Sequence, residues 1–113
     1  FHVPYNKETH HYLNDSFVDN MKKDFYLINT SRGKVVCKDA LLRALGSSKI
    51  KGACLDVFDN EKVQSYSAEE KAYINAFNLS GCVILSTHVA GWTRQSKIRL
   101  AKILSKKILA ALP

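Results

Sequence analysis

The chain has 113 residues and a mass of 12.7 kDa, which suits one domain and excludes two independent cores of ordinary size. Hydrophobic residues make up 46% and charged residues 24%, which excludes a disordered chain, and no apolar run approaches the roughly 20 residues that cross a bilayer. The net charge of +7 favours anionic partners, but apart from a concentration between Arg94 and Lys107 the basic residues are scattered, as is typical of a solvated surface.

The first half of the chain predicts a helix, a strand and a second helix. A short helix is expected from about Asp15 to Met21, capped by Asn14 or Asp15 itself. The segment Phe25–Asn29 is a nearly continuous apolar run, which predicts a parallel strand covered on both faces. Good helix formers over Lys38–Leu45 end at Gly46 and Ser47, so we predict a short crossover helix there.

The second half repeats the alternation of strand and helix. Apolar runs predict strands over Gly52–Phe58 and Val83–Leu85. Between them, Ser67 and Glu70 have the spacing of a capping box, which predicts a helix over about 68–77.

A last helix is expected from near Thr93 towards Leu112. Its apolar residues form one stripe, which consists of Ile98, Ala101, Leu104, Ile108 and Leu112. Most of its basic residues lie off that stripe and are expected to face solvent. Strands that alternate with helices predict an α/β fold, part of a doubly wound parallel sheet, in which ligands bind beyond the carboxyl ends of the strands.

Three residues of chemical interest follow the predicted strands, where a ligand would bind. Arg32 lies in the polar turn after the first strand, Glu61 follows the second and His88 the third. Alone, each has an ordinary structural explanation as a surface or loop residue. Together they suit reduction of a 2-keto acid: an arginine fork can hold a carboxylate, a histidine can exchange a proton near neutral pH, and a carboxylate can orient the histidine.

Several spaced motifs carry a family resemblance along the whole chain, in order: 2–4, 8–9, 27–36, 52–58 and 88–93. With these strings the chain resembles the D-isomer-specific 2-hydroxyacid dehydrogenases, in their phosphoglycerate dehydrogenase-like branch. The resemblance implies a Rossmann-like NAD-binding domain, a small 2-hydroxy or 2-keto acid as substrate, and a homodimer.

The resemblance also implies site residues. Arg32 would bind the substrate carboxylate, His88 would be the general acid and base, and Glu61 would pair with it. Asp56 would lie near the nicotinamide amide. The positions implied to line the NAD site are Val3, Pro4, Thr30, Ser31, Arg32, Asp56, His88, Ala90 and Gly91.

The departures from the family pattern are as informative as the matches. The chain lacks the Gly-x-Gly-x-x-Gly turn that cradles a pyrophosphate, so we interpret residues 1–113 as the second half of a dinucleotide-binding domain from a longer chain. Cys37 stands where an acidic helix cap is common, and a thiol is a poor cap. Lys62 replaces the proline that usually follows the position of Glu61.

Three further features have ordinary explanations. The three cysteines, Cys37, Cys54 and Cys82, stand far apart, which predicts no disulfide framework and no metal site, and hence a reducing, cytoplasmic compartment. The adjacent His10 and His11 are expected in a loop rather than as metal ligands, and Trp92 is either core packing or a wall of the substrate pocket.

The leading functional hypothesis is an NAD-dependent oxidoreductase most like D-3-phosphoglycerate dehydrogenase. Another 2-hydroxyacid dehydrogenase, acting on D-lactate or on glycerate and hydroxypyruvate, is the first alternative. A non-catalytic NAD-sensing module and a nucleic-acid-binding module that uses the basic last helix remain as alternatives from other classes. We expect no membrane partner and disfavour nucleic acid.

Overall fold

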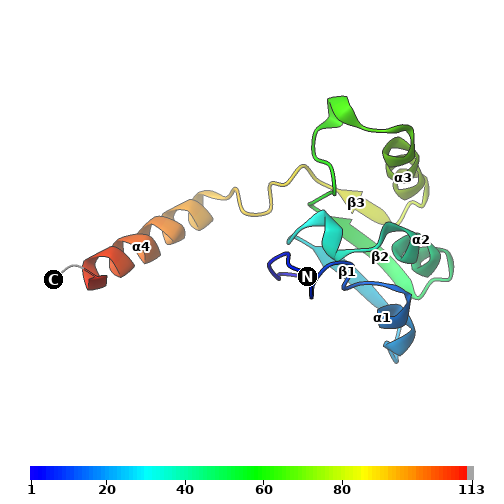
Figure 1. Cartoon of the computed structure of the whole chain (residues 1–113), viewed down its shortest axis with the longest axis horizontal. Helices are drawn as coiled ribbons and strands as arrows, with labels where there is room; N and C mark the ends of the chain where they lie inside the picture. The colour runs from blue at the N-terminus through cyan, green and yellow to red at the C-terminus, as the bar shows by residue number, and fades with distance from the viewer. Residues whose placement is uncertain (112–113) are drawn as a thin grey trace.

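The computed structural model describes residues 1–111 and contains a three-stranded parallel sheet in the order β1-β2-β3 (Figure 1). The strands are β1 (Phe25–Asn29), β2 (Ile50–Leu55) and β3 (Val83–Leu85). This confirms the predicted α/β parallel sheet. The second strand was expected over Gly52–Phe58 but ends at Leu55, because its neighbours end there too: Leu55 pairs with Asn29 on one side and with Leu85 on the other.

Four α-helices connect or follow the strands: α1 (Asp15–Asn20), α2 (Lys38–Gly46), α3 (Ala68–Leu79) and α4 (Arg94–Ala111). Two short 3-10 turns, Gly33–Val35 and Val63–Ser65, lie in the loops after β1 and β2. Each helix matches a predicted one, with α3 running two residues further than expected. The predicted end at Leu112 lies outside the described residues.

The helix starts follow local chemistry. Asn14 caps α1, accepting a hydrogen bond from Phe17 N at 2.9 Å. Ser67 and Glu70 form the predicted capping box at α3, with Ser67 N donating to Glu70 Oε2 at 2.7 Å. Cys37 precedes α2 without a side-chain cap, as expected of a thiol.

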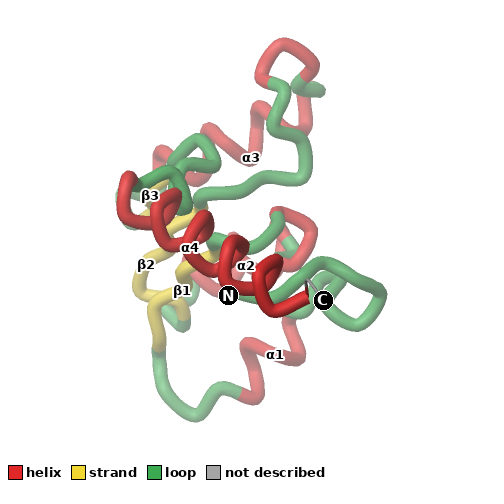
Figure 2. The backbone as a smooth tube through the Cα atoms, turned by 90° about the vertical axis from the view of Figure 1, so that its left-hand side faces the viewer, coloured by secondary structure: helices red, strands yellow, loops and turns green. Residues whose placement is uncertain are grey.

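The core lies on one face of the sheet only. Figure 2 shows α1, α2 and α3 to one side of the strands, and on that side Leu27 is buried against Leu41 and Phe77 in one cluster. Tyr26 and Ile28 point to the opposite face and are 72% and 57% exposed. The prediction that β1 is covered on both faces is therefore wrong for this chain, because an apolar run does not show which segment covers each side.

Helix α4 projects away from the sheet (Figure 1), and the long dimension of the molecule, 57 Å against 37 and 26 Å, reflects this. None of its described residues is buried, so the part of the apolar stripe within residues 94–111 is exposed together with the basic face. Trp92, just before α4, is 73% exposed, so it is not core packing in this chain, and its alternative as a wall of the substrate pocket stays a prediction. No helix among residues 1–111 is both long enough and apolar enough to span a membrane.

Candidate active site

The turn after β1 is organised by a buried asparagine. Asn29 Oδ1 accepts hydrogen bonds from Ser31 N at 3.1 Å and Ser31 Oγ at 2.6 Å, while its Nδ2 donates to Arg32 O at 3.0 Å. Asn29 is only 1% exposed, so these bonds fix the turn from beneath. The guanidinium of Arg32 stays exposed, with one nitrogen donating to Ser31 O at 2.6 Å. The side chain is therefore available for an anion beyond the strand end.

Gly33 brings this turn against the loop that follows β2. A Cβ atom at Gly33 would lie 2.1 Å from the carbonyl carbon of Phe58 and 2.3 Å from Asp59 N, both of them backbone atoms. Only glycine permits this approach. The two loops that carry Arg32 and Glu61 are thus packed backbone to backbone.

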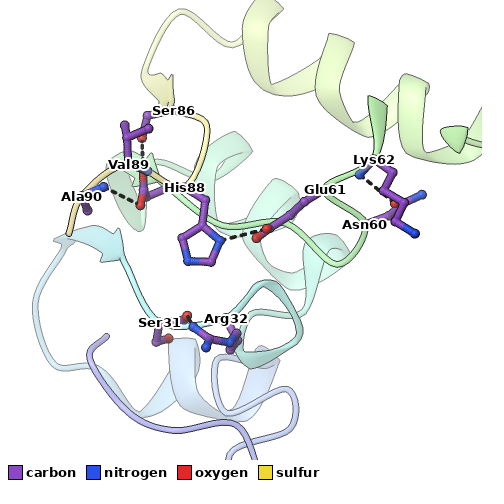
Figure 3. Close-up of polar contacts among 10 residues, drawn as sticks. Ser31, Arg32, Asn60, Glu61, Lys62, Ser86, His88, Val89 and Ala90 are labelled. Atoms are coloured by element: carbon purple, nitrogen blue, oxygen red, sulfur yellow. Dashed lines mark hydrogen bonds and ion pairs between the residues drawn. The ribbon is translucent and has the colours of Figure 1, made fainter. Parts of the chain in front are cut away.

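His88 and Glu61 form the predicted pair, although 27 residues separate them (Figure 3). His88 Nδ1 lies 2.8 Å from Glu61 Oε2, and because a carboxylate can only accept, Nδ1 carries the proton. The two side chains are 43% and 42% exposed. Nε2 is left for a substrate. Figure 3 shows Arg32 on the open side of the imidazole, and one cleft of about 510 Å³ is lined by Arg32, Glu61 and His88 together.

The backbone at His88 is held by Asp56. The histidine has a φ of +59°, a left-handed conformation that costs a non-glycine residue about 1 kcal/mol or more. Asp56 Oδ1 accepts from Val89 N and Oδ2 from Ala90 N, both at 2.9 Å, and Oδ1 also accepts from Ser86 Oγ at 2.5 Å. These three bonds surround the strained residue on both sides along the chain.

Asp56 is a buried residue, 5% exposed. Burial acts to raise its pKa, but the hydrogen bonds from Ser86, Ala90 and Val89 and the nearby His88 outweigh burial, so that the pKa lies below its ordinary value. Asp56 is therefore a charged anchor at neutral pH.

The loop around Glu61 departs from the family pattern at Lys62, and the structure shows what stands in place of a proline. Lys62 N donates to Asn60 Oδ1 at 3.0 Å, a bond that proline could not make. The difference in sequence thus does not prevent Glu61 from meeting His88.

A second, larger cleft of about 690 Å³ borders the Arg32 turn, and its size is typical of a ligand site. It brings together five of the predicted cofactor positions: Val3, Pro4, Thr30, Ser31 and Arg32. Asp56 and His88 line a smaller adjoining pocket, Ala90 is joined to Asp56, and Gly91 faces open space. The volume of this cleft, its hydroxyl groups and its arginine side chain are suited to part of an NAD molecule. The glycine-rich turn that would cradle the pyrophosphate is absent from this sequence.

Sequence reasoning missed two supporting residues. Asn29 carries a signal that could have been used, because an asparagine at a strand end before Thr-Ser is typical of a turn closed by its own side chain. Ser86 carries none, because its partner Asp56 is 30 residues away. Among the described residues, no group of histidines, cysteines and acids is placed to hold a metal ion. His10 and His11 stack on each other in a turn, with ring centroids 4.0 Å apart.

A parallel sheet with an arginine and an acid–imidazole pair at its carboxyl edge has the layout of a nucleotide-dependent α/β enzyme. A sequence model of the D-isomer specific 2-hydroxyacid dehydrogenase family, for its NAD binding domain, matches residues 1–90. The chain belongs to this family, and NAD is the cofactor of this domain. The family, the fold class and the cofactor predicted from the sequence are confirmed.

Individual relatives include enzymes of more than one specificity. The chain is 39% identical over 111 residues to glyoxylate reductase of Thermofilum pendens, which covers 98% of the chain and 30% of that protein. It is 32% identical over 98 residues to D-lactate dehydrogenase of Lactiplantibacillus plantarum, covering 81% of the chain and 29% of that protein. The phosphoglycerate branch is not singled out among these relatives.

Solved structures of 2-hydroxyacid dehydrogenases contain the fold of this chain. D-lactate dehydrogenase from Aquifex aeolicus, complexed with NAD and lactic acid, matches with a TM-score of 0.73 at 38% identity, over 96% of this chain and 35% of that one. A D-isomer specific 2-hydroxyacid dehydrogenase from Lactobacillus delbrueckii ssp. bulgaricus, in its NAD-complexed form, gives a TM-score of 0.74 at 28% identity, over 97% of this chain and 35% of that one. The chain thus spans about a third of the length of these relatives.

Proposed function

We propose that the protein containing this chain is an NAD-dependent oxidoreductase that interconverts a D-2-hydroxy acid and the corresponding 2-keto acid. The observation that carries the proposal is the 2.8 Å contact between His88 Nδ1 and Glu61 Oε2 in a cleft shared with Arg32. Membership of the family supports it.

The proposed roles follow from the chemistry of the three side chains. Arg32 holds the substrate carboxylate through its guanidinium, because one nitrogen donates to Ser31 O and the other N–H donors remain for the carboxylate. In the oxidation direction, Nε2 of neutral His88 accepts the hydroxyl proton, and Glu61 stabilises the imidazolium that results. The hydride acceptor for the same substrate carbon would be supplied by NAD when it is bound.

The proposed cofactor residues fall in two groups. Val3, Pro4 and the Thr30–Arg32 turn would border the dinucleotide along the larger cleft. Asp56 and the His88–Gly91 segment would lie near the nicotinamide end.

The choice of substrate is a finer proposal. The names of the relatives favour glyoxylate and pyruvate as 2-keto acids, and the family resemblance adds 3-phosphohydroxypyruvate as the third candidate. We further propose that residues 1–113 form the second half of a dinucleotide-binding domain, because the chain has no glycine-rich phosphate turn and spans 30% of its relatives. A homodimer remains a prediction for the intact protein.

The deciding experiment is oxidation of NADH by the intact protein with each of the three 2-keto acids, for the natural sequence and for His88→Ala. We expect turnover with at least one acid, and a fall of about 100-fold or more in kcat for His88→Ala with little change in NADH binding. Turnover of the variant close to that of the natural protein would overturn the assignment.

A further inference from the structure

We propose that Asn60 is a positioning residue that aims Glu61 at His88, and that it does so from the N-terminus of α3. The inference rests on the proposed roles of Glu61 and His88 and adds a residue to which the family resemblance gives no role. Asn60 lies directly before Glu61 and is partly buried.

The pair itself cannot maintain its geometry. Both side chains are more than two-fifths exposed, and an ion pair between exposed groups contributes little towards holding them in one geometry. The orientation must therefore come from the backbone on each side. On the histidine side, Asp56 holds the amides of Val89 and Ala90.

On the glutamate side, the holding group is the Asn60 side chain. Its Oδ1 accepts from Lys62 N at 3.0 Å, which closes a turn with Glu61 as the central residue. A side-chain oxygen that binds the amide two residues on restricts the backbone of the residue between them. The direction in which the Glu61 side chain leaves the loop is thereby set.

The amide nitrogen of Asn60 ties this turn to a rigid element. Nδ2 lies 3.3 Å from Glu70 Oε2, and also 3.2 Å from Ser65 Oγ and 3.4 Å from Ser65 O. Glu70 is fixed by the α3 capping box, where Ser67 N donates to the same Oε2 at 2.7 Å. The hydrogen bond from Ser67 N, with Asn60 among the weaker contributors, lowers the pKa of Glu70, so the acceptor is a carboxylate at neutral pH. A continuous set of contacts therefore runs from α3 through Asn60 to the loop that presents Glu61.

The test reads the His88–Glu61 contact directly in the intact protein, without activity. Isotope-labelled histidine reports by NMR which ring nitrogen is protonated, and His88→Gln identifies the signals of His88. At about pH 9, where an ordinary imidazole is neutral, we expect Nδ1–H to dominate at His88, because Nδ1 faces the carboxylate. Glu61→Ala gives the Nδ1–H fraction of His88 in the absence of the Glu61 carboxylate.

Asn60→Ala should change the fraction of His88 that carries its proton on Nδ1. We expect this fraction to move at least half of the way from its natural value to its value in Glu61→Ala. Asn60→Asp keeps the acceptor for Lys62 N but sets a carboxylate against Glu70, so it should lose part of the preference. Adding Glu70→Gln to Asn60→Asp removes the repulsion between the two carboxylates, while the remaining Gln oxygen can still accept from Ser67 N, and should recover part of the preference. Asn78→Ala, an exposed asparagine on α3, is the matched control and should change nothing.

Urea denaturation of each variant verifies that it is folded. If Asn60→Ala does not fold, the comparison of Asn60→Asp with the double variant Asn60→Asp/Glu70→Gln still tests the proposal. An unchanged proton distribution in Asn60→Ala, or no recovery in the double variant, overturns the proposal even if the intact protein reduces a 2-keto acid. If the variants shift as predicted but the intact protein reduces none of the three 2-keto acids, the proposed function is overturned and the positioning role of Asn60 is retained. In an active protein, Asn60→Ala should lower kcat by about tenfold and leave the KM for NADH unchanged.

Discussion

At the scale of single residues, Asp56 links the stability of the fold to the site. Its folded-state pKa lies below the ordinary value of about 3.9, so its charged form stabilises the fold above that value, and the stabilisation is lost as the pH falls through the folded-state pKa. An asparagine side chain at this position could accept through one atom only and would set its amide nitrogen against a backbone N–H. We expect Asp56→Asn to lower the free energy of unfolding at neutral pH by about 2 kcal/mol, measured by urea denaturation.

The same variant should lose much of its acid sensitivity. Between neutral pH and about pH 3 the natural chain should lose more stability than Asp56→Asn does, because the variant has no charge at this position to neutralise. Equal losses in the two proteins would contradict the role of Asp56 as a charged anchor.

Arg32 makes a second residue-scale prediction. Its planar guanidinium can form two parallel hydrogen bonds to a carboxylate, whereas lysine offers a single charged centre. We expect Arg32→Lys in the intact protein to lower kcat/KM for the 2-keto acid by roughly 30-fold, equivalent to about 2 kcal/mol. A change below about twofold in kcat/KM would argue against substrate binding by Arg32.

At the scale of elements, a side-chain contact joins α2 to α3. Tyr73 Oη donates to Asp39 Oδ1 at 2.5 Å, and Lys38 Nζ lies 4.9 Å from the centre of the Tyr73 ring. The hydrogen bond to Asp39, together with partial burial, raises the pKa of Tyr73 to about 12. The neutral phenol therefore stabilises the helix pair fully below about pH 10, and this stabilisation is lost as the pH rises through about 12.

An absorbance titration of tyrosinate checks this contact. One of the five tyrosines should ionise later than the rest, and Asp39→Asn should bring it back towards them. If Asp39→Asn leaves the late-titrating tyrosine in place, the contact with Asp39 is not its cause.

The packing of two loops gives another element-scale prediction. Because a Cβ at Gly33 would overlap the backbone of Phe58, Gly33→Ala must separate the loops that carry Arg32 and Glu61. We expect a loss of about 2 kcal/mol in the free energy of unfolding. Gly46→Ala is the control, since a Cβ there meets no atom within 4 Å. Equal stabilities for the two variants would show that the Gly33 turn can move without cost.

Local signals predicted much of the fold. The apolar run Phe25–Asn29 and the Ser67–Glu70 capping box appear with the bounds and bonds that the sequence indicates, because their physics acts within a few residues. The end of β2 was misplaced because Val57 and Phe58 continue the apolar pattern, whereas the strand ends where its pairing partners end.

The site shows the same division. Arg32, Glu61 and His88 were predicted from their places after the strands, and the structure brings them to one cleft. The bond from Ser86 to Asp56 and the contact of Asn60 with Glu70 could not be predicted, because they join residues thirty and ten positions apart and no short motif encodes them. Such supports follow from the fold and not from local spacing.

At the scale of the whole molecule, one face of the sheet and the apolar stripe of α4 are both uncovered. A row of side chains crosses the open face in register: Ile28 pairs with Cys54, and Cys54 pairs with Ile84. Ile28 is 57% and Ile84 67% exposed. Exposed apolar surface that spans a sheet favours association, because association removes that surface from water.

We therefore expect the 113-residue chain in isolation to self-associate with rising concentration, as measured by sedimentation velocity. Ile28→Thr combined with Ile84→Thr should weaken association at least tenfold, since burial of each isoleucine contributes about 1 kcal/mol or more, while threonine keeps the branched shape that strands favour. Leu79→Thr is the control, because Leu79 is 87% exposed at the end of α3, away from this face. Equal weakening by Leu79→Thr would show that general surface hydrophobicity drives association, and a chain that stays monomeric throughout would show that the open face does not.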